Sequence, residues 1–129
     1  TVQEIRELVI ATRKAKLPDY KVYPNAGSFF KNPFIIDDIR QKLSLAYPSM
    51  PFIQAGDRYK IPSAWLIEHV AQMKGVRIGN IGTWPNQPLV IVNYGKADAD
   101  EVVLFSQNII DRIQEKTGIV IEREVQFLL

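Results

Sequence analysis

Apolar residues recur at intervals of three and four along much of this chain, which is the spacing of one buried helical face. In the last such stretch the apolar stripe runs from Val102 to Ile113, and Gly118 follows as the expected end of the helix. Acidic or hydroxyl side chains stand before the later stretches, where an N-cap is needed. We therefore predict four helices: at residues 1–14, at 39–47, at 63–73, and a last one that ends at 117. The expected N-caps are Asp37 or Asp38 for the second helix, Ser63 for the third, and Asp98 or Asp100 for the last.

Short apolar runs and one alternating stretch predict the strands. The run at 89–92 is continuously apolar, as in a strand covered on both faces, whereas 119–127 alternates between apolar residues and a polar face carrying Glu122, Glu124 and Gln126. We also predict strands at 34–36 and 58–61, and a loop at 49–57 because that segment is rich in proline and polar residues. The whole pattern predicts an α+β fold, a small mixed β-sheet flanked by about four helices, and its 129 residues suffice for one domain but not two.

Composition narrows the chemistry. The chain has no cysteine and one histidine, which excludes thiol nucleophiles, disulfides and thiolate metal sites, so no metal is expected. Trp65 and His69 stand four apart in a predicted helix and should stack, which favours a structural role for that histidine. A net charge of +2, from 16 basic and 14 acidic residues that are interspersed, does not predict nucleic-acid binding. No apolar run approaches the roughly 20 residues that span a membrane.

The segment Asn25–Pro33 carries the densest candidate chemistry. Gly27 permits backbone angles closed to other residues, and two adjacent phenylalanines can anchor the loop. Ser28, Lys31 and Asn32 would then face a partly desolvated cleft, where polar contacts are stronger. The alternative is a well-anchored surface turn without chemistry, and composition alone does not decide between the two.

Other polar residues are ambiguous when they are taken alone. Lys16 lies in a basic neighbourhood that favours simple solvation over an anion site, and Gln87 is an ordinary polar residue before a strand. Glu124 fits the wet side of an edge strand. The three glycines of residues 74–82 have the spacing of neither a dinucleotide-binding loop nor a Walker loop, so a phosphate cradle is not indicated there.

The sequence resembles a known family along nearly its whole length. The block NAGSFFKNP at 25–33 is highly specific, and KLPD at 16–19, AWLIE at 64–68, KGVRIG at 74–79 and EREV at 122–125 follow in the same order. These motifs are similar to the C-terminal part of UDP-N-acetylenolpyruvoylglucosamine reductase, also called UDP-N-acetylmuramate dehydrogenase. The resemblance implies a bacterial, cytoplasmic flavoenzyme of peptidoglycan synthesis. Such an enzyme reduces the enolpyruvyl ether of UDP-N-acetylglucosamine enolpyruvate with electrons from NADPH through bound FAD.

The resemblance also implies roles for individual residues. Ser28 matches the proton donor, and Glu124 matches a carboxylate that acts at the reacting centre. Lys16 and Asn32 match residues on the diphosphate of the UDP-sugar, and Gln87 matches a residue at the substrate site. Nothing in residues 1–129 resembles an FAD site, so we expect this chain to be the substrate-binding part of a longer enzyme whose N-terminal domain binds FAD. The rival hypothesis is a UDP-sugar or phosphate-binding module without enzymatic activity.

Overall fold

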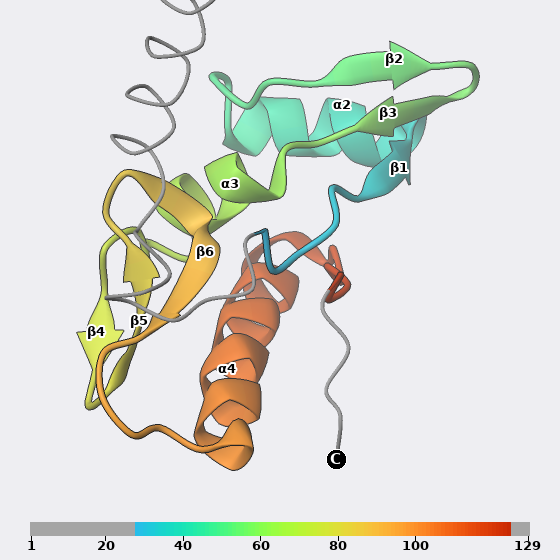
Figure 1. The fold of residues 1–129 in the computed structure, drawn as a ribbon. Helices are drawn as coiled ribbons and strands as arrows, with labels where there is room; N and C mark the ends of the chain where they lie inside the picture. Colours follow the sequence, from blue (N-terminus) through green and yellow to red (C-terminus); the bar gives the residue numbers. More distant parts are fainter. Residues whose placement is uncertain (1–27, 125–129) are drawn as a thin grey trace, which may run out of the picture.

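The computed structural model describes residues 28–124 (Figure 1). The predicted helix at 1–14, the candidate residue Lys16 and Gly27 lie outside the described residues, as do positions 125–127 of the last predicted strand. All other elements predicted from the sequence can be compared with the structure.

The described strands form two antiparallel three-stranded sheets. In the first, β3 (Arg58–Lys60) lies between β1 (Phe34–Ile36) and β2 (Ile53–Ala55). In the second, β5 (Ile81–Trp84) lies between β4 (Arg77–Ile78) and β6 (Gln87–Asn93). The helices are α2 (Asp37–Ala46), α3 (Ser63–Trp65), which continues as a π-helix at Leu66–Val70, and α4 (Ala99–Thr117). The predicted α+β class is confirmed, but the described strands form two small antiparallel sheets in place of the single mixed sheet that was predicted.

The hairpin of β2 and β3 corrects the predicted loop at 49–57. Ile53, Gln54 and Ala55 pair with β3 across a turn in which Gly56 has φ +64°. All three residues of β2 are exposed, so the strand has no alternation of buried and exposed positions to reveal it in the sequence. The pairing with β3 therefore determines the extended conformation of β2. Figure 1 shows the hairpin of β2 and β3 extending over α2.

The predicted caps of α2 and α3 are wrong, whereas that of α4 is confirmed. Helix α2 begins at Asp37 without a side-chain cap, and the Asp37 carboxylate instead accepts hydrogen bonds from Arg40 Nε at 2.9 Å and Gln41 Nε2 at 2.6 Å. The hydrogen bond from Arg40 is the main reason why the pKa of Asp37 lies below its ordinary value. Ser63 is the first residue of α3, not its cap. Asp98 caps α4 by accepting from the Glu101 N–H at 2.9 Å.

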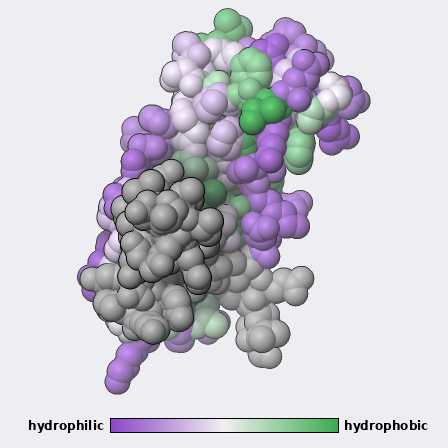
Figure 2. Space-filling view, turned by 45° about the horizontal axis from the view of Figure 1, so that its top comes forward, coloured by the Kyte–Doolittle hydropathy of each residue, from purple (hydrophilic) through white to green (hydrophobic). Residues whose placement is uncertain are grey.

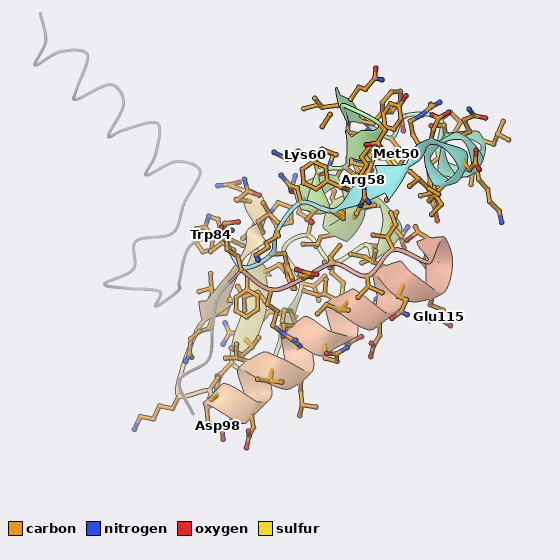
Figure 3. All side chains as sticks on the ribbon, turned by 90° about the vertical axis from the view of Figure 1, so that its right-hand side faces the viewer. Met50, Arg58, Lys60, Trp84, Asp98 and Glu115 are labelled. Carbon is orange, nitrogen blue, oxygen red and sulfur yellow. The ribbon has the colours of Figure 1, made fainter. Side chains whose placement is uncertain are left out.

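Helix α4 and strand β6 supply much of the core. Phe105, Ile109 and Ile113 on α4 are all at most 5% exposed, as the apolar stripe predicts. In β6, three consecutive residues from Val90 to Val92 are buried, which confirms a strand covered on both faces. Figure 3 shows α4 along its length, between the labelled Asp98 and Glu115.

The segment after Ser63 is shorter and more irregular than the predicted helix at 63–73. The π-helix ends at Val70, and Gln72 adopts φ +55°. The rings of Trp65 and His69 stack at a centroid distance of 4.8 Å, which confirms the predicted pairing. Within residues 28–124, no helix is long and apolar enough to cross a membrane.

Candidate functional site

The segment that begins at Ser28 lies against β6 through its backbone. Ser28 forms a bridge with Val90, and the Phe29 N–H donates to the Leu89 carbonyl at 2.8 Å. The rings of Phe29 and Phe30 are 3% and 1% exposed and meet edge to face at 5.1 Å. The two phenylalanines thus anchor the segment in the core, as the sequence predicts, while Ser28 stays exposed.

The same segment pairs on its other side with residues 122–124. The Lys31 N–H donates to the Glu122 carbonyl and the Glu124 N–H donates to the Phe29 carbonyl, both at 2.8 Å. Only an isolated bridge, between Phe30 and Arg123, forms in the described part of the strand predicted at 119–127. This pairing places Glu124 next to Ser28, although the two are 96 positions apart in the sequence.

Arg123 fixes this pairing to α4. Its Nε donates to the Ser106 hydroxyl at 2.8 Å, and its Nη2 donates to Gln107 Oε1 at 2.9 Å. Ser106 is fully buried. The backbone that carries Glu124 is therefore held between the Ser28 segment and α4.

Asn32 is held by the start of α3. Its side-chain oxygen accepts from the Ser63 N–H at 2.9 Å, and the Ser63 hydroxyl donates to the Lys31 carbonyl at 2.6 Å. A backbone N–H can only donate, so the oxygen of the Asn32 carboxamide must face Ser63. The amide nitrogen of Asn32 is then the end of the side chain that can donate to a ligand.

These residues line one open pocket of about 340 Å³. Three of the predicted site residues, Ser28, Asn32 and Glu124, lie in its wall together with Lys31 and Lys60. Lys60 was not predicted, because nothing in its local sequence distinguishes it. Only the pairing of Lys60 with Phe34 across β3 and β1 brings it to this pocket. Figure 3 shows Lys60 close to Arg58 on the same strand.

Gln87 does not line this pocket. It is half-buried at the start of β6, and its side-chain oxygen accepts from the Leu89 N–H at 3.3 Å. Leu89 is part of the pocket wall, so Gln87 adjoins the pocket through its neighbour. No group of three or more His, Asp or Glu side chains that could hold a metal ion occurs within residues 28–124.

Comparison with known proteins decides the family. Residues 18–128 match the family described as UDP-N-acetylenolpyruvoylglucosamine reductase, C-terminal domain. The chain belongs to this family. The match covers the Ser28 segment, Asn32 and Glu124, so these lining residues of the pocket lie within the matched domain.

Individual reductases are similar to this chain along nearly its whole length. A UDP-N-acetylenolpyruvoylglucosamine reductase of Porphyromonas gingivalis is 41% identical over 130 residues, covering 100% of this chain and 38% of that protein. The protein of the same name from Flavobacterium johnsoniae is 40% identical, covering 99% and 38%. That from Photobacterium profundum is 39% identical, covering 97% and 36%. This chain therefore spans less than two-fifths of the length of these relatives.

Proposed function

We propose that this chain is the substrate-binding part of a reductase that converts UDP-N-acetylglucosamine enolpyruvate to UDP-N-acetylmuramate in the bacterial cytoplasm, with NADPH and FAD. The observation that carries the proposal is the convergence of Ser28, Asn32 and Glu124 on one pocket. These residues come from two segments far apart in the sequence, and the family match covers both segments, which supports the proposal.

Ser28 and Glu124 are proposed to act at the reacting carbons. Reduction of the enolpyruvyl ether adds a hydride to one alkene carbon and a proton to its neighbour, and negative charge builds toward an enolate between the two events. Ser28 is exposed in the pocket wall, so its hydroxyl can reach a ligand and give up the proton. The Ser28 hydroxyl donates a long hydrogen bond of 3.4 Å to the Phe30 carbonyl, which a substrate can replace. Glu124 is proposed to help polarise the intermediate.

The diphosphate is proposed to lie against Asn32 and Lys16. The orientation of the Asn32 carboxamide supports this role, because its amide nitrogen is the end left to donate. Lys31 and Lys60 in the same wall give the pocket two further positive charges against the single carboxylate of Glu124. Such a balance favours an anionic ligand. Gln87 is proposed to reach the substrate from the edge of the pocket.

We propose that the flavin is held outside the described residues. Residues 28–124 contain no glycine-rich loop before a helix N-terminus of the kind that holds a dinucleotide. We therefore place FAD on an N-terminal domain of the longer protein, and the hydride would come from there. The residues of this chain bind the substrate, orient it and supply the proton.

A binding module without catalysis is the second candidate. The cationic pocket wall with Asn32 would hold a nucleotide sugar whether or not a flavin domain is present. The reductase and the binding module are distinguished by one measurement, which is turnover by the protein expressed with its upstream coding region. Turnover is expected of the reductase and not of the binding module.

The first test is a titration of the 129-residue chain with UDP-N-acetylglucosamine, followed by backbone amide NMR shifts. The proposal expects shifts clustered at Ser28, Asn32 and Glu124. In the protein expressed with its upstream region, Ser28→Ala should abolish turnover while NADPH still reduces the flavin, and Ser49→Ala, an exposed serine outside the pocket, should change neither. Retained turnover in the Ser28→Ala protein would defeat the assignment of the proton donor.

A further inference from the structure

A second and larger hollow of about 670 Å³ lies between β1, α2 and the C-terminal end of α4. Neither Ser28 nor Glu124 lines it, so it is distinct from the reacting centre proposed above, although Phe34 lines both hollows. Figure 3 shows Arg58, one of its lining residues, on the side of the hairpin toward the α4 end marked by Glu115. We call this hollow the α2–α4 groove.

Exposed apolar side chains are concentrated in the α2–α4 groove. Phe34, Ile36, Ile39 and Val120 all line it, and their exposed fractions are 52%, 48%, 40% and 54%. They are four of the nine large apolar residues that are exposed among the described residues. Scattered apolar residues are normal on a surface, whereas these four are grouped around one hollow, which makes the hollow a candidate contact site. Figure 2 shows apolar residues among hydrophilic ones at the end of the molecule that holds α2 and the hairpin.

The charged residues of the groove all have the same sign. Lys42, Arg58 and Lys116 line it, and no aspartate or glutamate does. Lys42 and Arg58 form no ion pair with any described residue. The Lys116 ammonium donates to the Val70 carbonyl at 3.0 Å, which orders the side chain without neutralising its charge. Helix α2 carries two carboxylates: that of Asp37 is paired with Arg40 at 2.9 Å, and that of Asp38, an exposed residue four positions before Lys42, forms no ion pair with a described residue.

We infer that the α2–α4 groove binds a segment of polypeptide that presents apolar side chains together with carboxylates. The apolar floor would take the hydrophobic side chains and the three cations would pair with the acidic ones, which is the arrangement by which grooves hold amphipathic segments. A volume of about 670 Å³ is enough for several side chains. A lipid surface is the poorer match, because membrane binding needs apolar side chains that protrude, and these surround a hollow.

The test uses the 129-residue chain and a fluorescent model peptide. The peptide carries leucines at i, i+3, i+4 and i+7 with glutamates on the remaining face, and a matched control carries lysine at every glutamate position. Fluorescence anisotropy should show saturable binding of the acidic peptide and at least tenfold weaker binding of the basic one. The double variant Lys42→Glu, Arg58→Glu should bind the acidic peptide at least tenfold more weakly. Lys96→Glu, which changes an exposed lysine outside the groove, should bind it unchanged.

Denaturation curves show whether the variants are folded. If the double variant does not fold, Val120→Glu, which changes an exposed residue of the groove wall, replaces it and should lose binding equally. The inference is overturned if neither peptide binds, if both bind equally, or if the groove variants bind like the unaltered chain. It is also overturned if the chain binds phosphatidylglycerol vesicles but not the peptide, or if the groove is covered by a second copy in a concentration-dependent dimer that Val120→Glu abolishes.

Discussion

Replacement of Asn32 by aspartate should separate the folding role of this residue from its proposed role in binding. The aspartate keeps an oxygen where the Ser63 N–H now donates at 2.9 Å, so the link to the start of α3 survives. It replaces the amide nitrogen, the group that would donate to the diphosphate, by a second carboxylate oxygen. Folding should therefore be preserved and anion binding should be lost.

The size of the binding loss follows from two contributions. A hydrogen bond to a charged group is worth about 1.5–3 kcal/mol. Repulsion between like charges about 4 Å apart adds up to roughly 4 kcal/mol near a protein surface, before screening by salt. Even the lower figure alone corresponds to a loss of more than about tenfold, and both together to more than about a hundredfold.

The assays are isothermal titration with UDP-N-acetylglucosamine and urea denaturation. Asn32→Ala is expected to lose both functions, because it also leaves the Ser63 N–H unpaired at a cost of about 1–3 kcal/mol. Asn108→Asp on α4 adds the same charge outside the pocket and should change neither binding nor stability appreciably. Unchanged affinity in the Asn32→Asp protein would refute the placement of the diphosphate at Asn32 and leave that residue a structural role only.

Three further predictions concern stability. Ser63→Ala should lower the free energy of unfolding by about 1–2 kcal/mol, because it removes the donor to the Lys31 carbonyl. Ser44→Ala should be neutral or slightly stabilising, since the shielded Ser44 hydroxyl has no partner in the described residues. Equal effects of the two substitutions in urea denaturation would contradict this prediction. Gly82→Ala should cost more than about 2 kcal/mol by thermal unfolding, because the new Cβ would lie 2.7 Å from the Val76 carbonyl oxygen. Asp37→Asn should destabilise the protein above about pH 5, where the carboxylate is charged in both the folded and the unfolded state. The stability difference between the two proteins should shrink as the pH falls below about 4, since the pKa of Asp37 is lowered on folding. A stability difference that is independent of pH would contradict the role of the hydrogen bond from Arg40.

The local pattern of the sequence was sufficient for elements whose conformation and burial it encodes directly. The stripe from Val102 to Ile113 and the following Gly118, with φ +77°, determine the course and end of α4. The continuous apolar run in β6 determines a strand covered on both faces. The specific block around Ser28 pointed to the family, which the comparisons establish.

Tertiary structure decided what depends on contacts between distant segments. Strand β2 is exposed throughout and exists because β3 pairs with it. Asp37 and Ser63 had the chemistry of helix caps, but Arg40 and the Lys31 carbonyl offered them better-placed partners. Above all, Glu124 comes beside Ser28 through a backbone bond to Phe29, and Lys60 reaches the same pocket only through strand pairing. Local spacing encodes which face of an element is apolar, but it carries no information about which remote residues the packed faces bring together.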